Sequence, residues 1–391
     1  MVIREARIPI FVFHSISQSP EWLIDTHVSI SVKTFEQYMK YLSKNSYQTV
    51  SLDDIYLHIK GEKALNCKIV ALTFDDGYLD NWIAAYPILK KYGFKATIFI
   101  PTDFIDPHPL VRRNLEDVWY RKTNEDDLEW KGYLSWEELR IMGKEEVFYA
   151  ESHTKSHTWL FSENKIIDFY KPGDRRVWIQ WNKYPELKPW WYQHKVEKDT
   201  QLMGYPVHPA KRALLVKGAY KGNHSLERRL NNFVKGNGGR SFFQRYDWKN
   251  LLKKEIKNTP QNDSEWETEE ESQYRIYQEL KESKDIIETN LNKKVNFLCW
   301  PGDKTDKMLE KIALQIGYKA TTSMNGYNRK GEDFRKLKRI YAPHFCSLPG
   351  KEFLNYISFV FNLKLFEGNY FYYIPVFFLN CLSKLTKMLW V

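Results

Sequence analysis

Short apolar runs alternate with stretches of helical spacing over the first hundred residues. The apolar runs at 8–13, 69–74 and 96–100 predict strands, while apolar positions at helical spacing over 34–42 and 79–92 predict helices. Strands that are apolar along their length and that alternate with helices are typical of a parallel sheet or barrel. The pattern therefore predicts an α/β fold.

Polar signals mark where further helices begin. Ser51 is followed by acidic residues in the first turn, and Ser135 and Glu138 have the spacing of a capping box. Sustained periodicity is then lost over 159–265, which we interpret as a long insertion. The remaining regular elements are expected as strands at 47–52, 147–150, 295–298, 319–322 and 337–341 and as helices at 269–290 and 305–316.

The last part of the chain, 351–391, is apolar and aromatic. Its longest uncharged stretch, 368–383, is shorter than the roughly 20 residues that a spanning helix needs, and it contains Pro375. An amphipathic tail that lies in a membrane interface is the first interpretation, and a helix pair packed on the barrel is the alternative. On the first interpretation, a chain that stops before Phe353 should be a soluble catalytic domain.

Composition narrows the class of protein. Apolar residues make up 43% and charged residues 28% of the 391 residues, as in soluble proteins with a large core. The net charge of +10 comes from the insertion, because 161–260 holds 21 lysines and arginines against 9 acidic residues. Such a segment indicates an anionic partner, either phosphate groups, anionic lipid or nucleic acid, although no nucleic-acid motif is present.

The cysteines and the N-terminus bear on the compartment. The four cysteines are far apart in the sequence, without a C-x-x-C pair, which fits a reducing environment. The short apolar run at 8–13 is too brief for the core of a signal peptide. We therefore expect a cytoplasmic protein, held peripherally at the inner face of the membrane by its tail.

Two short motifs carry candidate chemistry. Asp75 and Asp76 follow the predicted strand at 69–74, and the carboxyl ends of barrel strands are where catalytic groups gather. His153 and His157 follow another predicted strand at a spacing that lets two imidazoles bind one ion. Two nitrogens and one carboxylate oxygen leave an open position for water, as in a catalytic metal site.

These motifs, T-F-D-D-G and S-H-T-K-S-H, resemble the first two motifs of the polysaccharide deacetylase family, carbohydrate esterase family four with its NodB-homology domain. The resemblance continues through I-P-I-F-V-F-H-S, V-S-L-D-D, K-Y-G-F-K-A-T-I-F-I, E-L-K-E-S-K-D-I-I-E and F-L-C-W-P-G-D, over about 250 residues in the family's order. It implies a distorted (β/α)7 barrel formed by 1–158 and 266–350, with the insertion at 159–265 and the tail at 351–391.

The resemblance also implies roles for individual residues. Asp75 would be the general base, and Asp76, His153 and His157 would hold one divalent ion, with zinc the first choice and nickel, cobalt or iron open. His344, after the last predicted strand, would be the general acid. His14, near the end of the first strand, is the alternative imidazole.

The third motif departs from the family. Many members have R-x-P-Y where this chain has Cys299-Trp300-Pro301-Gly302, so we expect the chain to lack the arginine that would orient Asp75. An aromatic residue and a proline at this point are similar to the exopolysaccharide N-acetylglucosamine deacetylase branch. The residues expected to contact substrate are Trp300, Pro301 and Tyr78, together with Arg175 and Arg176 of the insertion.

The sequence thus predicts a metal-dependent hydrolase that removes the N-acetyl group of an amino sugar in cell-surface glycan biosynthesis. A substrate linked to phosphate or a lipid carrier would match the basic insertion and the tail. The alternatives are a deformylase or an O-acetyl esterase with the same site, or an inactive carbohydrate-binding barrel. No protein partner can be inferred.

Overall fold

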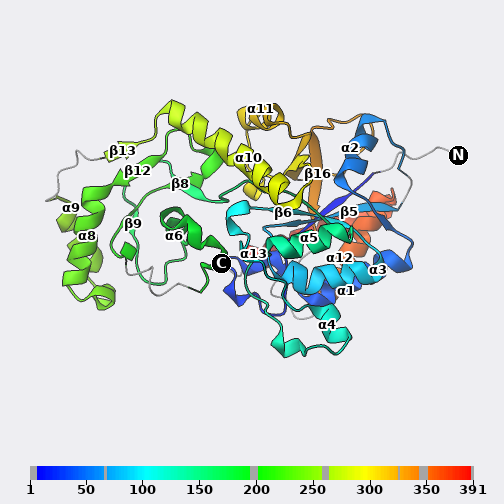
Figure 1. Cartoon of the computed structure of the whole chain (residues 1–391), viewed down its shortest axis with the longest axis horizontal. Helices are drawn as coiled ribbons and strands as arrows, with labels where there is room; N and C mark the ends of the chain where they lie inside the picture. The colour runs from blue at the N-terminus through cyan, green and yellow to red at the C-terminus, as the bar shows by residue number, and fades with distance from the viewer. Residues whose placement is uncertain are drawn as a thin grey trace. The chain divides into compact units, whose positions relative to one another are not determined.

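Seven parallel strands pair into a closed ring; several of them are labelled in Figure 1. The computed structural model describes residues 7–65, 68–193, 201–257, 264–324, 326–342 and 351–388. The ring closes because β1 pairs with both β16 and β5. In ring order its strands are β1 (Ile10–Phe13), β16 (Lys336–Tyr341), β15 (Ala320–Met324), β14 (Phe297–Leu298), β7 (Phe148–Ser152), β6 (Ala96–Ile100) and β5 (Ile69–Asp75).

Apolar runs explain why these strands form the interior. Every residue of β1, β5 and β6 is buried, as parallel strands covered on both faces require. The pairing is in register, with Phe13 opposite Phe74 and Thr73 opposite Thr97. The strand predicted at 47–52 is shorter than expected. Of this stretch, the two residues of β4 (Gln48–Thr49) form a strand, which pairs with β5. The predicted (β/α)7 barrel is confirmed.

Helices surround the barrel strands and begin where the sequence indicates. Ser51 and Ser135 each cap a helix in a complete capping box, with Asp54 and Glu138 respectively. The helix expected at 79–92 is divided into a π-helical turn over Asn81–Ala85 followed by α3. The helices concerned are α1 (Val32–Lys44), α2 (Leu52–Lys60), α3 (Tyr86–Tyr92), α4 (Leu115–Trp119), α5 (Trp136–Lys144), α10 (Glu269–Leu291) and α11 (Lys307–Ile316).

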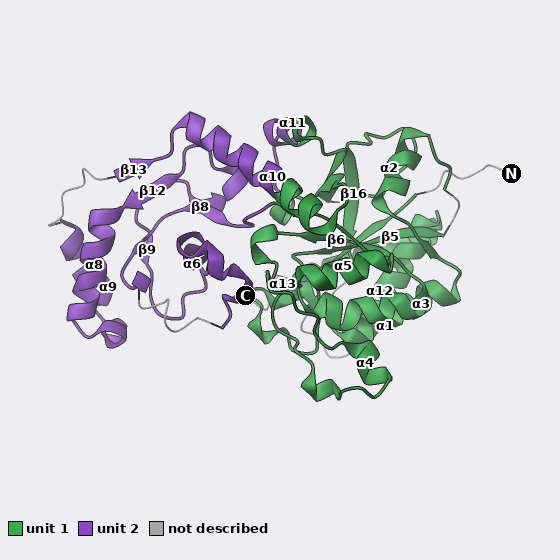
Figure 2. Ribbon diagram, in the orientation of Figure 1, with its two compact units in different colours: residues 1–154, 283–303, 313–391 green, residues 155–282, 304–312 purple. Residues whose placement is uncertain are grey.

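The chain divides into two compact units (Figure 2). Unit 1 holds the barrel and comprises 1–154, 283–303 and 313–391; unit 2 comprises 155–282 and 304–312. Unit 2 therefore extends past the expected boundaries of 159 and 265, because the first half of α10 belongs to it.

The insertion is more regular than its sequence pattern indicates. Three antiparallel strand pairs and three α-helices occur within its described part. In α8, Leu226, Leu230 and Val234 are buried at four-residue spacing around Phe242, so a helical periodicity that the sequence interpretation missed is present here. The elements are β8 (Trp159–Phe161), β9 (Asp168–Phe169), α6 (Trp178–Lys183), β10 (Pro206–Val207), β11 (Ala210–Arg212), β12 (Tyr220–Asn223), α8 (His224–Gly236), α9 (Trp248–Lys257) and β13 (Ser264–Trp266).

The tail forms two helices, α12 and α13, and α12 is packed into the barrel core. In α12 (Lys351–Phe366), Phe359 is fully buried and its ring stacks on Tyr38 of α1 at 4.1 Å and lies 4.9 Å from Phe11 of β1. Glu367 accepts a hydrogen bond from Tyr47 at 2.6 Å. The expectation that the whole tail is separable is therefore wrong for α12, which is part of the barrel's packing. α13 (Tyr373–Met388) follows it.

Candidate active site

The polar side chains named in the sequence meet at the carboxyl end of the barrel strands. Asp75 ends β5, His14 follows β1, His153 follows β7 and Cys299 follows β14. Because parallel strands all point the same way, residues far apart in the sequence come together at one end of the barrel. All four belong to unit 1.

Asp75 is held by an arginine from another strand. Its two carboxylate oxygens accept hydrogen bonds from Nη1 and Nη2 of Arg339 at 2.7 and 2.9 Å, and both side chains are buried. Nη1 of Arg339 also donates to the hydroxyl of Thr73 at 3.3 Å. The conclusion that this chain lacks an arginine to orient Asp75 is therefore wrong, since β16 supplies one where the third motif does not.

A signal for Arg339 was present in the sequence. Side chains alternate between the two faces of a strand, so Leu337 and Arg339 share a face of β16. Both are buried, whereas Lys336 and Lys338 between them are partly exposed. An arginine on the apolar face of a barrel strand needs a buried anion. The anion itself could be identified only from the closed barrel.

The charge of Asp75 is set by competing effects. Burial raises the pKa of the Asp75 carboxyl, but the charges of Arg339, His153 and His14 outweigh burial, so the net shift lowers its pKa. Asp75 is thus ionised at neutral pH. His14 faces the same carboxylate, with its Nε2 atom 3.9 Å from Oδ2 of Asp75.

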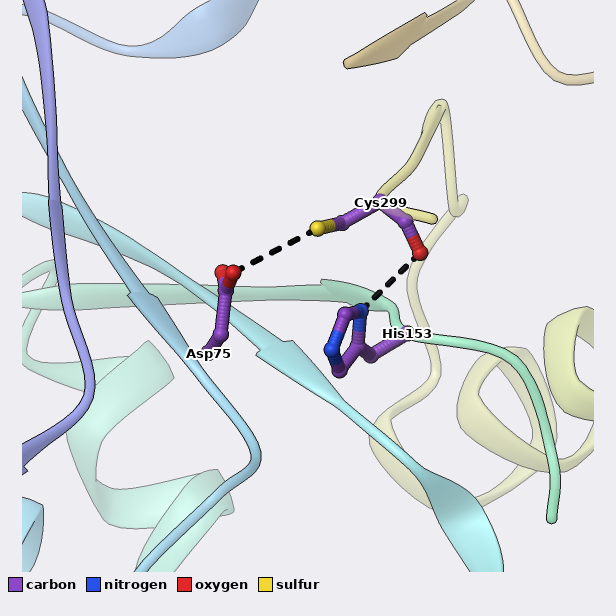
Figure 3. A group of neighbouring side chains, drawn as sticks. All are labelled: Asp75, His153 and Cys299. Atoms are coloured by element: carbon purple, nitrogen blue, oxygen red, sulfur yellow. Dashed lines mark hydrogen bonds between the residues drawn. The ribbon is translucent and has the colours of Figure 1, made fainter. Parts of the chain in front are cut away.

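Asp76 and His153 face each other as two ligands of one cation would. Nε2 of His153 lies 3.3 Å from Oδ1 of Asp76. Nδ1 of His153 lies 2.9 Å from the carbonyl oxygen of Cys299 (Figure 3), and because a carbonyl only accepts, Nδ1 must carry the proton. Nε2 is the nitrogen that faces Asp76, and although burial lowers the pKa of His153, the nearby Cys299, Asp76 and Asp75 outweigh burial and raise that pKa. A bound cation would take the place of the proton on Nε2, while the hydrogen bond from Nδ1 orients the ring, as is usual for metal-binding histidines. The residues present fit a divalent ion.

The backbone beside these ligands is strained. Asp76 has a φ of 72° and Thr154 a φ of 68°, values that residues with a side chain rarely adopt. Gly77 also has a positive φ, of 66°, and a Cβ atom there would meet Ile100 and Ile105 at 3.2 Å. Strain of this kind persists where the surrounding structure over-determines it, commonly at functional sites.

A second group of ligand-type atoms lies deeper in the barrel. Asp75, His153 and Cys299 each offer one atom within 4.8 Å of the others (Figure 3). The Cys299 thiol lies 3.5 Å from Asp75 and 2.8 Å from Nη2 of Arg339. Because the guanidinium of Arg339 already supplies positive charge there, this group is a poor cation site. Its contacts instead hold the Asp75 carboxylate in place.

The remaining predicted residues have different surroundings. Tyr78 is half-buried and stacks on Tyr133, with ring centroids 5.5 Å apart, and burial is the main effect that raises its pKa, with a contribution from a hydrogen bond to Asp76. Trp300 is completely buried, so its ring contacts protein on all sides, and Pro301 beside it is buried as well. His344 lies outside the described residues.

Three of the predicted residues, His157, Arg175 and Arg176, belong to unit 2, although His157 was expected in the barrel segment. The His157 ring packs edge-on against Trp159 at 6.3 Å, and its backbone φ is 44°. Arg176 is neutralised by Asp174 and Asp168, while Arg175 is exposed. Of the two arginines, Arg175 is thus the one whose side chain is open to solvent.

Comparisons with known proteins agree with the motifs and the barrel. Residues 62–204 match the family model described as polysaccharide deacetylase. The Bacillus subtilis protein YxkH, whose name assigns it to the polysaccharide deacetylases, is 43% identical over 116 residues, which are 29% of this chain and 39% of that protein. The chain carries a domain of the polysaccharide deacetylase family.

Within this family, one similarity falls on a named enzyme. The poly-beta-1,6-N-acetyl-D-glucosamine N-deacetylase of Escherichia coli K12 is 25% identical over 127 residues, 32% of this chain and 18% of that enzyme. The chain thus spans well under half the length of both relatives. A solved structure of a de-N-acetylase from Aggregatibacter actinomycetemcomitans has the same fold, with a TM-score of 0.51 and 16% identity over 85% of this chain and 94% of that one.

Proposed function

We propose that this protein is a metal-dependent deacetylase that hydrolyses the N-acetyl group of an amino sugar. The observation that carries the proposal is that a candidate base and a candidate metal ligand, Asp75 and Asp76, are adjacent at the end of β5. Asp75, locked by Arg339, has the chemistry of an oriented base, while the adjacent Asp76 faces His153 in the manner of metal ligands. Membership of the deacetylase family agrees with this chemistry.

The proposed metal ligands are Asp76, His153 and His157. His157 enters through the S-H-T-K-S-H motif, in which it follows His153 by four residues and so lies within about 14 Å of it along the chain. Two imidazoles and one carboxylate favour zinc, with nickel, cobalt and iron as alternatives. A bound divalent ion supplies Lewis acidity, which makes a water molecule more acidic and the acetyl carbonyl more electrophilic.

The chain's own residues would carry the proton transfers. Asp75 accepts the proton of the attacking water, and the bidentate contact with Arg339 keeps its carboxylate ionised and fixed in direction. A second group must then protonate the leaving amine. His344 is the candidate from the family resemblance, and His14, whose Nε2 lies 3.9 Å from Asp75, is the candidate from geometry.

The proposed substrate is an N-acetylhexosamine of cell-surface glycan biosynthesis that is linked to phosphate or to a lipid carrier. The excess positive charge of the insertion supports an anionic substrate group, and the exposed Arg175 is the candidate contact there. Tyr78 is the candidate contact beside Asp76. Such intermediates occur at the inner face of a membrane, where we propose that the enzyme works peripherally.

Mass spectrometry of reaction products tests the activity. The purified protein is incubated with a lipid-phosphate-linked N-acetylhexosamine, the free sugar and a chitin oligomer, and loss of one acetyl group is expected fastest from the first. Formyl and O-acetyl analogues of the same sugars test the neighbouring chemistries. Equal rates on the three N-acetyl substrates would contradict the proposal that the substrate is linked to a lipid carrier. Turnover of the formyl or ester analogues alone would contradict N-deacetylation.

Variants separate the metal from the base. Asp76→Ala, His153→Ala and His157→Ala should each lose bound metal, whereas Asp75→Asn should keep the metal and lose turnover by a factor of about a hundred or more. Elemental analysis of each purified variant gives the metal content. Full metal occupancy in a variant that lacks both histidines would contradict the ligand assignment.

A further inference from the structure

Helix α13 carries a stripe of exposed apolar side chains. Ile374, Phe378, Leu382 and Leu385 follow one another at spacings of four, four and three residues, which places them on one side of the helix. Ile374 is 65%, Phe378 66% and Leu385 56% exposed. Val376, on the opposite side, is only 6% exposed. The helix therefore turns an apolar side outward.

This outward orientation is imposed by α12. α12 packs on α1 and α13 packs on α12, all within unit 1. The ring centroid of Phe361 in α12 lies 4.9 Å from that of Tyr372, the residue just before α13. Because Phe359 fixes α12 in the barrel core, the buried side of α13 is also fixed. Folding thus leaves the stripe exposed instead of burying it.

An apolar stripe of this length is unusual on a soluble surface. Single exposed apolar residues need no explanation, but a contiguous patch marks an interaction site. Three aromatic residues extend the patch at the N-terminal end of α13, where Tyr370, Phe371 and Tyr373 are 57%, 81% and 61% exposed. Tyrosine and phenylalanine gathered at one end of an apolar stripe are typical of segments that lie at a membrane surface.

Charge favours a lipid surface over a second copy of the chain. The sequence has no acidic residue from 368 to 391 but has lysines at 384 and 387 of the same helix. In a protein of net charge +10, a helix with lysines and no acidic residue favours anionic headgroups over a second copy of the same positively charged chain. None of the described helices has both the length and the hydrophobicity to cross a bilayer.

We propose that α13 lies flat in the interface of an anionic lipid bilayer, with its apolar stripe among the acyl chains, while α12 holds it on the barrel. The partner is thus a phospholipid surface, and the contact is made by one helix and not by the whole tail. This inference identifies α13 as the element that would hold the protein at the proposed membrane location. It does not depend on the deacetylase activity.

Vesicle flotation of the full-length protein tests this proposal. Vesicles of phosphatidylcholine alone are compared with vesicles that also contain phosphatidylglycerol, at low and at moderate salt. The expected result is strong binding to the anionic vesicles that weakens with salt. The triple variant Ile374→Gln, Phe378→Gln, Leu385→Gln should bind at least about tenfold more weakly, because each change removes apolar surface that would enter the bilayer.

A matched variant controls for the loss of exposed apolar surface. Leu110→Gln, Val111→Gln and Tyr120→Gln change side chains that are also exposed in unit 1 but lie outside α13, so vesicle binding should stay at the wild-type level. Glutamine has good helix propensity, and both triple variants should keep the wild-type circular dichroism spectrum.

Several results would overturn the proposal. They are absence of binding to anionic vesicles, equal binding by the α13 variant, equal loss in the control variant, and equal binding to neutral vesicles at all salt concentrations. A lipid-free dimer in light scattering that the α13 substitutions convert to a monomer would show that a second copy covers the stripe. Binding is measured without substrate, so these outcomes are independent of whether the deacetylase proposal holds.

Discussion

At the scale of single residues, the site depends on one buried ion pair. Asp75 and Arg339 are both almost completely buried, and each is the other's main compensating charge. The desolvation of two such groups is tolerable only while both are present. The carboxylate proposed as the base is therefore also one half of an ion pair in the barrel core.

Removing one member of this pair should cost more than removing both. Arg339→Met leaves the Asp75 carboxylate buried without its cation and should lower the free energy of unfolding by about 3–5 kcal/mol. The double variant Asp75→Asn, Arg339→Met should recover much of that loss, because no uncompensated charge is left. Denaturant unfolding of the wild type, the two single variants and the double variant measures the coupling. Additive effects of the two changes would contradict the assignment.

Asp80 should make the stability of the fold decrease as the pH rises. Burial raises its pKa to about 6, although Ser15, Ile16 and Asn81 donate hydrogen bonds that lower it in part. A carboxyl whose pKa is higher in the folded than in the unfolded state stabilises the fold below its unfolded pKa, and this contribution is lost as the pH rises to about 6.

Comparison with Asp80→Asn isolates this contribution. The wild type should lose about 2 kcal/mol of unfolding free energy relative to the variant between pH 4.5 and pH 7.5, as a shift of this size requires. Denaturant titrations at both pH values give the difference. A difference that is the same at both pH values would show that Asp80 is not the group responsible.

At the scale of elements, α12 belongs to the barrel although it follows the last strand. Its buried Phe359 stacks between α1 and β1, so Phe359→Ala should create a cavity and destabilise the protein by about 3–5 kcal/mol. Phe353→Ala removes an exposed ring from the same helix and should change stability by less than about 0.5 kcal/mol. Equal effects of the two changes in thermal or denaturant unfolding would mean that α12 does not pack as described.

At the scale of the whole molecule, the fold and the proposed metal site are separable. The seven strand pairings and the apolar core are made by the chain's own backbone and apolar side chains, whereas the proposed ligands stand at strand ends and in loops. Removal of metal by a chelator should therefore abolish turnover while the far-ultraviolet circular dichroism at 25 °C is unchanged, unlike a zinc finger, which unfolds. Restored activity on adding back zinc is the control, and cooperative unfolding on chelation is the contradicting result.

The sequence by itself determined the local elements and the family. Apolar runs, the acidic first turn after Ser51 and the capping-box spacing at Ser135 predicted strands and helices within a few residues, because these signals act over one turn or one strand. The two motifs around Asp75 and His153 indicated the family, since their residues are close in the chain. The interpretation of the insertion as irregular was wrong, because α8 and α9 have helical spacing that was missed.

Only the tertiary structure decided which distant residues act together. Closure of the ring brings β16 close to β5, and this alone lets Arg339 reach Asp75, 264 positions earlier in the chain. The same holds for α12 and α13, whose sequences are similarly apolar. Packing on α1 buries one side of α12, whereas one side of α13 stays exposed. Hydrophobic pattern records which side of an element is apolar, whereas the partner of that side depends on contacts between distant segments.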